Sequence, residues 1–135
     1  MRRLALVFVF AWFFLGGIAH FVATELEMMI VPAWLPAHRA LVLASGALEL
    51  LGAAALLFRR TRCWAGWGLI ALTVAVTPAN IHMLLHAQAF PAIPYWALVL
   101  RLPLQLALIG CIWWATQRRT RGERPCGVSS GVLGR

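Results

Sequence analysis

Four long apolar runs, separated by short polar or proline-containing connections, organise this chain. We place them at residues 4–23, 39–58, 64–86 and 95–115. Each is close to the ~20 residues that an α-helix needs to cross ~30 Å of hydrocarbon. Strand-like alternation of apolar and polar residues is absent, and a helix satisfies its backbone groups internally. The pattern predicts an all-α membrane protein, a four-transmembrane-helix bundle formed by residues 1–116.

A cleaved signal peptide is the alternative interpretation of the first run, which follows Arg2 and Arg3. The run continues without a clear small-x-small cleavage site, and three more runs follow it. Both observations favour a retained transmembrane helix.

The first connection, ATELEMMIVPAWLPAHR, predicts a short interfacial helix between the first two spans. Thr24 and Glu27 have the spacing of a capping box, in which both side chains bond N–H groups at a helix start. Pro32 and Pro36 end the helix, and Trp34 between them is a residue type enriched at membrane interfaces. A plain connecting loop is the alternative.

Two prolines lie inside apolar runs, Pro78 in the third and Pro103 in the fourth. Proline lacks an N–H, and its ring clashes with the preceding turn of a helix. We therefore expect both helices to kink or loosen at these positions.

Arginines gather before the first run, between the second and third runs, and after the fourth run, whereas the third connection has none. This is the positive-inside pattern, and it predicts that both termini lie in the cytoplasm. Residues 117–135 are polar, glycine-rich and without periodicity, which predicts a disordered basic cytoplasmic tail. The arginines that carry the pattern are Arg2, Arg3, Arg59, Arg60, Arg62, Arg118, Arg119, Arg121, Arg124 and Arg135.

The composition agrees with a membrane location. The chain is 62% hydrophobic and only 12% charged, with a mean hydropathy of +0.82. Soluble domains average about 25% charged residues. The formal net charge of +8 is a topology signal because its arginines flank the spans, so we expect the lipid bilayer as partner and no nucleic acid.

Polar residues interrupt the half of the bundle opposite the arginine-rich connections. A rise of 1.5 Å per residue places Glu49 about 15 Å and Arg101 about 9 Å from that surface of the membrane. The planar guanidinium suits a carboxylate, so we predict a Glu49–Arg101 ion pair, with neighbouring amides filling the remaining hydrogen-bond positions. The candidate site is His20, Glu49, Asn80, Arg101 and Gln105.

Two interpretations of this site remain open. Buried polar residues can hold helices together without any other role. Ionisable groups inside a membrane also mark ligand or proton sites.

Motifs for other chemistry are absent. No Walker loop, zinc cluster, haem-attachment motif or dinucleotide fingerprint is present, and no cysteine belongs to a C-x-x-C pair. His82 and His86 have the spacing of two metal ligands on a helix, but no carboxylate or thiol accompanies them. We therefore expect no metal site, and no catalytic motif identifies an enzyme.

Short motifs occur in order across the four runs. They are Gly16-Gly17 with His20-Phe21, Pro32-x-Trp34-Leu35-Pro36, Ser45-Gly46-x-x-Glu49-Leu50, Pro78-x-Asn80 and Arg101-Leu102-Pro103-x-Gln105. In these motifs the chain resembles the DoxX-like family of small four-helix bacterial membrane proteins, over residues from about 13 to 116. The resemblance implies a single bundle in the bacterial inner membrane and a link to redox chemistry, because some members serve thiosulfate:quinone oxidoreductase or thiol-stress complexes. The resemblance also implies that the five candidate residues form a polar site within the bundle.

Three functional hypotheses follow. The first is an accessory subunit of a membrane or peripheral oxidoreductase, whose polar pocket binds a quinone or another amphiphile. The second is a non-enzymatic scaffold, whose polar residues only hold the helices together. The third is a small transporter or proton conduit, which ranks last because the arginine-rich half shows no polar path.

Overall fold

The computed structural model describes residues 1–91 and 93–117, and every regular element within these ranges is helical. This confirms the all-α prediction. The elements are α1 (Arg2–Val22), α2 (Thr24–Ile30), α3 (His38–Leu57), α4 (Arg62–Ala75), α5 (Thr77–Leu85), the short 3₁₀ helix η1 (Ala87–Ala89) and α6 (Tyr95–Gln117).

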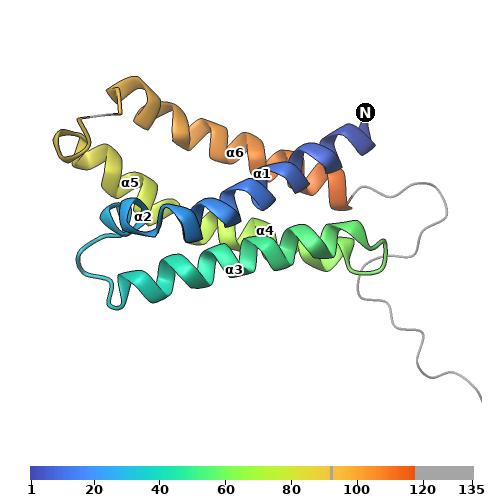
Figure 1. Ribbon diagram of the computed structural model, residues 1–135. Helices are drawn as coiled ribbons and strands as arrows, with labels where there is room; N and C mark the ends of the chain where they lie inside the picture. The colour runs from blue at the N-terminus through green and yellow to red at the C-terminus, as the bar shows by residue number, and fades with distance from the viewer. Residues whose placement is uncertain (92, 118–135) are drawn as a thin grey trace, which may run out of the picture.

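The long helices form one antiparallel ring. α1 packs on α3 and α6, and α4 packs on the same two helices. α5 continues the direction of α4 and packs on α6, while α2 packs across the end of α3 (Figure 1). We call the end that carries α2 and η1 the α2 end. We call the opposite end, which carries the N-terminus and the α3–α4 connection, the arginine end.

Four helical segments are long and apolar enough to cross a membrane. Each of their ends lies within two residues of the end predicted from the sequence. Gln117, the first residue of the predicted tail, is the last residue of α6, and the remainder of that tail lies outside the described residues. The segments are Arg2–Val22, His38–Leu57, Arg62–Leu85 and Tyr95–Gln117.

The short helix predicted in the first connection is confirmed as α2, but its capping box is wrong. Thr24 is the first residue of α2, and its hydroxyl donates to the carbonyl oxygen of His20 at 2.7 Å and to that of Phe21 at 3.2 Å. Thr24 therefore satisfies carbonyl groups at the end of α1, while α2 has no side-chain cap. Glu27 has no capping role and lines a cavity described below.

The two prolines inside the spans have different effects. The third span is divided at Val76, which separates α4 from α5. Pro78 lies in the first turn of α5, where its missing N–H has no helical partner to lose. α6 continues through Pro103. The predicted interruption by proline therefore becomes a helix boundary in the third span only.

A buried hydrophobic cluster occupies the half of the bundle toward the arginine end, while Val42, Met83 and Leu98 are buried in the other half. The cluster is apolar and draws on α1, α3, α4 and α6, whose side chains interdigitate there. Polar groups gather in the other half, so the two halves of the bundle differ in character. The core cluster is Val9, Phe13, Ala53, Leu56, Ala65, Leu69 and Ile112.

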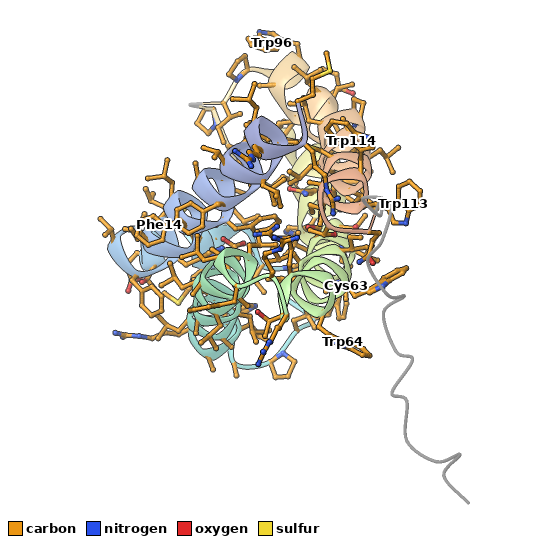
Figure 2. The ribbon with its side chains drawn as sticks, turned by 90° about the vertical axis from the view of Figure 1, so that its right-hand side faces the viewer. Phe14, Cys63, Trp64, Trp96, Trp113 and Trp114 are labelled. Carbon is orange, nitrogen blue, oxygen red and sulfur yellow. The ribbon has the colours of Figure 1, made fainter. Side chains whose placement is uncertain are left out.

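The exterior of the bundle is apolar and aromatic. Figure 2 shows four labelled aromatic side chains on the outside, and each is between 42% and 67% exposed. Many leucines and valines of the long helices are exposed as well. The four aromatic residues are Phe14, Trp64, Trp96 and Trp113.

The contact between α4 and α6 depends on Gly66, because a Cβ there would overlap the Thr116 hydroxyl. We expect Gly66→Ala to lower the free energy of unfolding in detergent by about 1–3 kcal/mol, the usual effect of overpacking. Gly68 lies on the same helix with no atom within 4 Å of an added Cβ. Gly68→Ala should therefore leave stability unchanged or raise it. Equal destabilisation by the two substitutions, measured by thermal unfolding, would contradict the close α4–α6 packing.

Candidate functional site

Two neighbouring cavities lie in the half of the bundle toward the α2 end. The larger, which we call the α2 cavity, has a volume of ≈ 390 Å³ and is lined by residues from all six α-helices. The smaller, which we call the α6 cavity, has a volume of ≈ 360 Å³. Both volumes fall within the range typical of small-molecule sites. Glu49, Asn80 and Arg101 line both cavities and therefore lie where the two meet.

Glu49 pairs with His20 across the α1–α3 contact. The Nε2 atom of His20 lies 3.5 Å from Oε1 of Glu49, and the two side chains are only 16% and 13% exposed. A carboxylate that is largely withdrawn from solvent needs an opposite charge or a hydrogen-bond donor, and the imidazole lies where it can supply one. Nδ1 of His20 is buried and has no hydrogen-bond partner within the described chain.

Glycines make this pairing sterically feasible. A Cβ at Gly16 would come within 2.7 Å of Oε2 of Glu49, and one at Gly46 would come within 2.6 Å of Cβ of His20. Gly17 also lies against the backbone of Gly46. Small residues allow helix backbones to approach closely in membranes. The close approach of α1 to α3 brings the imidazole and the carboxylate together.

The predicted Glu49–Arg101 ion pair is not formed. Within residues 1–91 and 93–117, Arg101 has no hydrogen bond or ion pair, and its side chain is exposed. It lines the same two cavities as Glu49. The error concerns the partner, because the carboxylate is engaged by a residue of the adjacent helix α1.

Asn80 and Gln105 form a second polar group that holds α6 to the α4–α5 break. Nδ2 of Asn80 donates to Oε1 of Gln105 at 2.8 Å. Nε2 of Gln105 donates to the carbonyl oxygen of Thr73 and to Oγ1 of Thr77, each at 2.6 Å. Both amide hydrogens of Gln105 are thereby used. Gln105 therefore supports the backbone where the span is interrupted near Pro78. The amides were predicted to bond Glu49 and Arg101, but they bond each other and the backbone instead.

Sequence reasoning missed three residues of this site. Glu27 lines the α2 cavity from α2. Its place on a short helix close to Ile30 and Val31, which also line the cavity, is the sequence feature that could have indicated this. Thr73 contributes a backbone carbonyl and Thr77 a hydroxyl, and the proline at position 78 was the signal for a nearby break that needs such bonds.

Metal ligation has no support in the part of the chain that the structure describes. No group of three or more metal-ligating side chains comes together among these residues. The rings of His82 and His86 are 4.3 Å apart, and Nδ1 of His86 contacts the carbonyl oxygen of His82 at 3.0 Å. The pair lies on α5 and at its end, and neither residue lines the two cavities.

The arrangement can bind a ligand with an apolar body and hydrogen-bond acceptors. The cavity walls are predominantly apolar, and the guanidinium of Arg101 offers five N–H donors that no described residue engages. Asn80 retains one amide hydrogen, since its described bond uses only one. Glu49 and Glu27 provide carboxylates in the α2 cavity.

Comparison with known proteins gives a family. A family model described as a domain of unknown function (DUF8561) matches residues 9–117, which is most of the chain, so the chain belongs to this family. No curated protein matches the chain, and no solved structure matches it.

A double-mutant cycle tests the His20–Glu49 pair. We expect His20→Phe and Glu49→Gln to couple by about 1 kcal/mol in unfolding free energy, because the two groups are in direct contact. Arg101→Gln and Glu49→Gln should be additive within about 0.5 kcal/mol. The unfolding free energies of the wild type, the two single variants and the double variant, measured in mixed micelles, complete each cycle. A larger coupling energy of Glu49 with Arg101 than with His20 would show that Arg101 is the partner of the carboxylate.

Proposed function

We propose that this member of the DUF8561 family is a DoxX-like integral protein of the bacterial inner membrane, with both termini in the cytoplasm. In this proposal it is an accessory subunit of a redox system. It binds a quinone or another amphiphile in the α2 and α6 cavities, and a membrane or peripheral oxidoreductase is its partner.

The apolar exterior supports the membrane location. Four helical segments can cross a membrane, and aromatic and aliphatic side chains cover their outer faces. A soluble monomer rarely exposes so much contiguous apolar surface. Arg2, Arg3, Arg59 and Arg62 meet at one end of the bundle, as the positive-inside rule requires of a cytoplasmic face.

Arg101 is the observation that carries the ligand proposal. Its guanidinium lies on α6 beside two largely apolar cavities and has no described protein partner. A charge inside the apolar part of a membrane is costly and usually marks a function. Carbonyl oxygens of a quinone head group would accept hydrogen bonds from the guanidinium, while the ring and the start of the tail would pack against the apolar walls of the cavities.

The neighbouring polar residues have distinct roles in this proposal. Gln105 uses both of its amide hydrogens within the bundle, so it positions the site and does not donate to the ligand. Glu49 and His20 form a pair that would pass a proton to the quinone as the oxidoreductase partner supplies the electrons that reduce it. The unpartnered Nδ1 atom of His20 is the position where such a proton would be held or released.

The scaffold hypothesis is the second candidate, and the bonds of Gln105 favour it. Asn80 and Thr77 on α5 both bond Gln105 on α6 without any ligand. Such bonds in membranes stabilise a bundle by about 0.6 kcal/mol each on average. A scaffold role does not account for Arg101. The transporter hypothesis is weakest, because an apolar cluster fills the half of the bundle toward the arginine end.

Quinone titration tests the ligand proposal. A short-chain ubiquinone analogue, added to the purified protein in detergent, should quench tryptophan fluorescence saturably, because Trp12 lines the α6 cavity. Arg101→Gln should weaken binding about tenfold, the equivalent of losing ~1.4 kcal/mol of a charge-assisted hydrogen bond. Arg39→Gln is the matched control, since this exposed arginine lines neither cavity.

Unchanged affinity in Arg101→Gln, or equal losses in both variants, would contradict the quinone site and favour the scaffold. Circular dichroism of each variant confirms that the comparison concerns folded protein. Arg101 makes no described contact that holds helices together, so its replacement leaves the bundle intact.

A further inference from the structure

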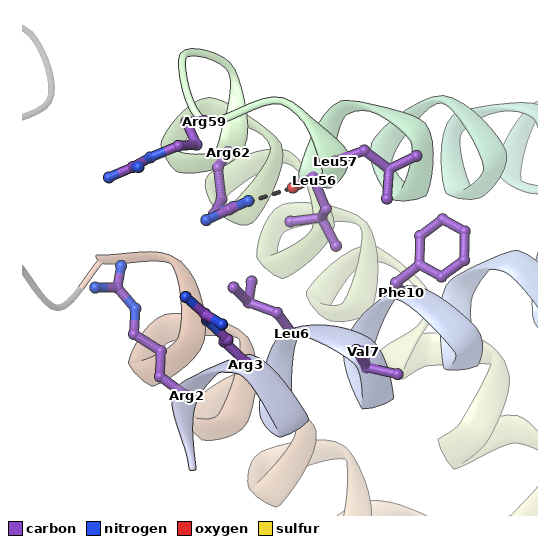
Figure 3. A pocket seen from close by; sticks show the side chains of 9 residues that line it. All are labelled: Arg2, Arg3, Leu6, Val7, Phe10, Leu56, Leu57, Arg59 and Arg62. Carbon is purple, nitrogen blue, oxygen red and sulfur yellow. Dashed lines mark hydrogen bonds between the residues drawn. The ribbon is translucent and has the colours of Figure 1, made fainter.

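A third pocket lies at the arginine end of the bundle, far along the helices from the candidate site. Its volume is ≈ 660 Å³, and it is formed by the start of α1, the end of α3, the α3–α4 connection and the first residue of α4. Figure 3 shows the arginine side chains gathered at one end of the pocket and apolar side chains at the other. The lining residues are Arg2, Arg3, Leu6, Val7, Phe10, Leu56, Leu57, Arg59 and Arg62.

We propose that this pocket binds one anionic phospholipid, with the phosphate held by the arginines and an acyl chain lying against the apolar wall. The inference rests on the membrane location proposed above, but it is independent of the quinone site. We call the pocket the arginine pocket.

Two of the guanidinium groups are held in place by backbone carbonyls. Nε of Arg2 donates to the carbonyl oxygen of Ala115 at 2.9 Å, near the end of α6. Nε of Arg62 donates to the carbonyl oxygen of Leu56 at 3.0 Å, near the end of α3 (Figure 3). Each guanidinium has five N–H donors, so these bonds leave the terminal nitrogens available to bind an anion.

The described carboxylates all lie outside the pocket, and Arg59 alone of its arginines has a further contact. Glu25, Glu27 and Glu49 are the described carboxylates, and none of them lines the arginine pocket. Arg3 makes no hydrogen bond or ion pair among the described residues. Several guanidiniums around one concave site favour an anion with several acceptor oxygens, which a phosphate provides.

The apolar wall indicates that the anion is part of a lipid. Phe10 lies seven residues beyond Arg3 on α1, which is about 10 Å along the helix. Val7 and Leu57 are 64% and 60% exposed, so this wall continues onto the outer surface of the bundle. A free phosphate would use only the arginine end. A phospholipid would use both ends, because its phosphate and its acyl chains are covalently linked and can span the ~10 Å from Arg3 to Phe10.

The positive-inside rule alone does not require a pocket, and Arg60 separates the two explanations. Arg60 lies between Arg59 and Arg62, in the α3–α4 connection, but does not line the pocket. A diffuse attraction to anionic membrane surfaces would draw on all three arginines alike, at about 1 kcal/mol each. A bound lipid would depend on the lining arginines only.

The test places the full chain in nanodiscs of equal dioleoylphosphatidylglycerol and dioleoylphosphatidylcholine. Native mass spectrometry then identifies the lipids that remain on the protein after release. We expect a phosphatidylglycerol enrichment of about fivefold, equivalent to ~1 kcal/mol, because the two lipids share their chains and differ in net charge. Arg3→Gln should reduce the enrichment to near unity, and Arg60→Gln should leave it unchanged.

Three results would overturn the proposal: no enrichment in the wild-type chain, equal loss in Arg3→Gln and Arg60→Gln, or retention of inorganic phosphate in place of lipid on the wild-type chain. The last result would assign the pocket to a free anion. Arg3→Gln removes no described hydrogen bond, so loss of lipid in this variant does not reflect unfolding. Arg101→Gln should not alter lipid enrichment, which separates this proposal from the quinone site. Failure of the chain to enter nanodiscs would instead refute the membrane location.

Discussion

The position of the Glu49 carboxylate, only 13% exposed among apolar helices, is the constraint on which the rest of the site depends. An unpaired carboxylate would be strongly unfavourable there, so the fold must bring a partner to it. The glycines of α1 and α3 allow the two backbones to approach until Nε2 of His20 lies 3.5 Å from Oε1 of Glu49. Because this contact joins the helices on either side of α2, the same approach defines the wall of the α2 cavity.

The pairing of Glu49 with His20 determines what the other polar residues can do. It leaves the Arg101 guanidinium without a described protein partner beside two apolar-walled cavities. Gln105 cannot replace the missing partner, because its amide is occupied by Asn80, Thr73 and Thr77 at the α4–α5 break. The bundle is therefore divided along its length: an apolar core toward the arginine end, and a partly unsatisfied polar site toward the α2 end.

Hydropathy predicted the four spans within two residues at each end, because length and apolar content suffice to define a membrane-crossing helix. Depth along the helices also predicted that the polar residues share one half of the bundle. The pairing was not predictable in the same way. It depends on how each helix is rotated and how closely neighbours approach, and the role of Gly16 and Gly46 became apparent only with α1 and α3 side by side. Pro78 and Pro103 looked alike in sequence, yet only Pro78 coincides with a helix boundary, where Gln105 bonds the nearby carbonyl of Thr73.

The most direct measurement is of the distances around Glu49 in a bilayer. Rotational-echo double-resonance NMR on the protein with ¹⁵N-histidine or ¹⁵N-arginine, and with ¹³C-labelled glutamate, reports which nitrogen lies near the carboxylate carbon. The account predicts strong dephasing from Nε2 of His20, which lies 3.5 Å from Oε1 of Glu49, and its loss in His20→Phe. It predicts no comparable dephasing from the Arg101 guanidinium. Strong dephasing that disappears in Arg101→Gln and persists in His20→Phe would contradict the account.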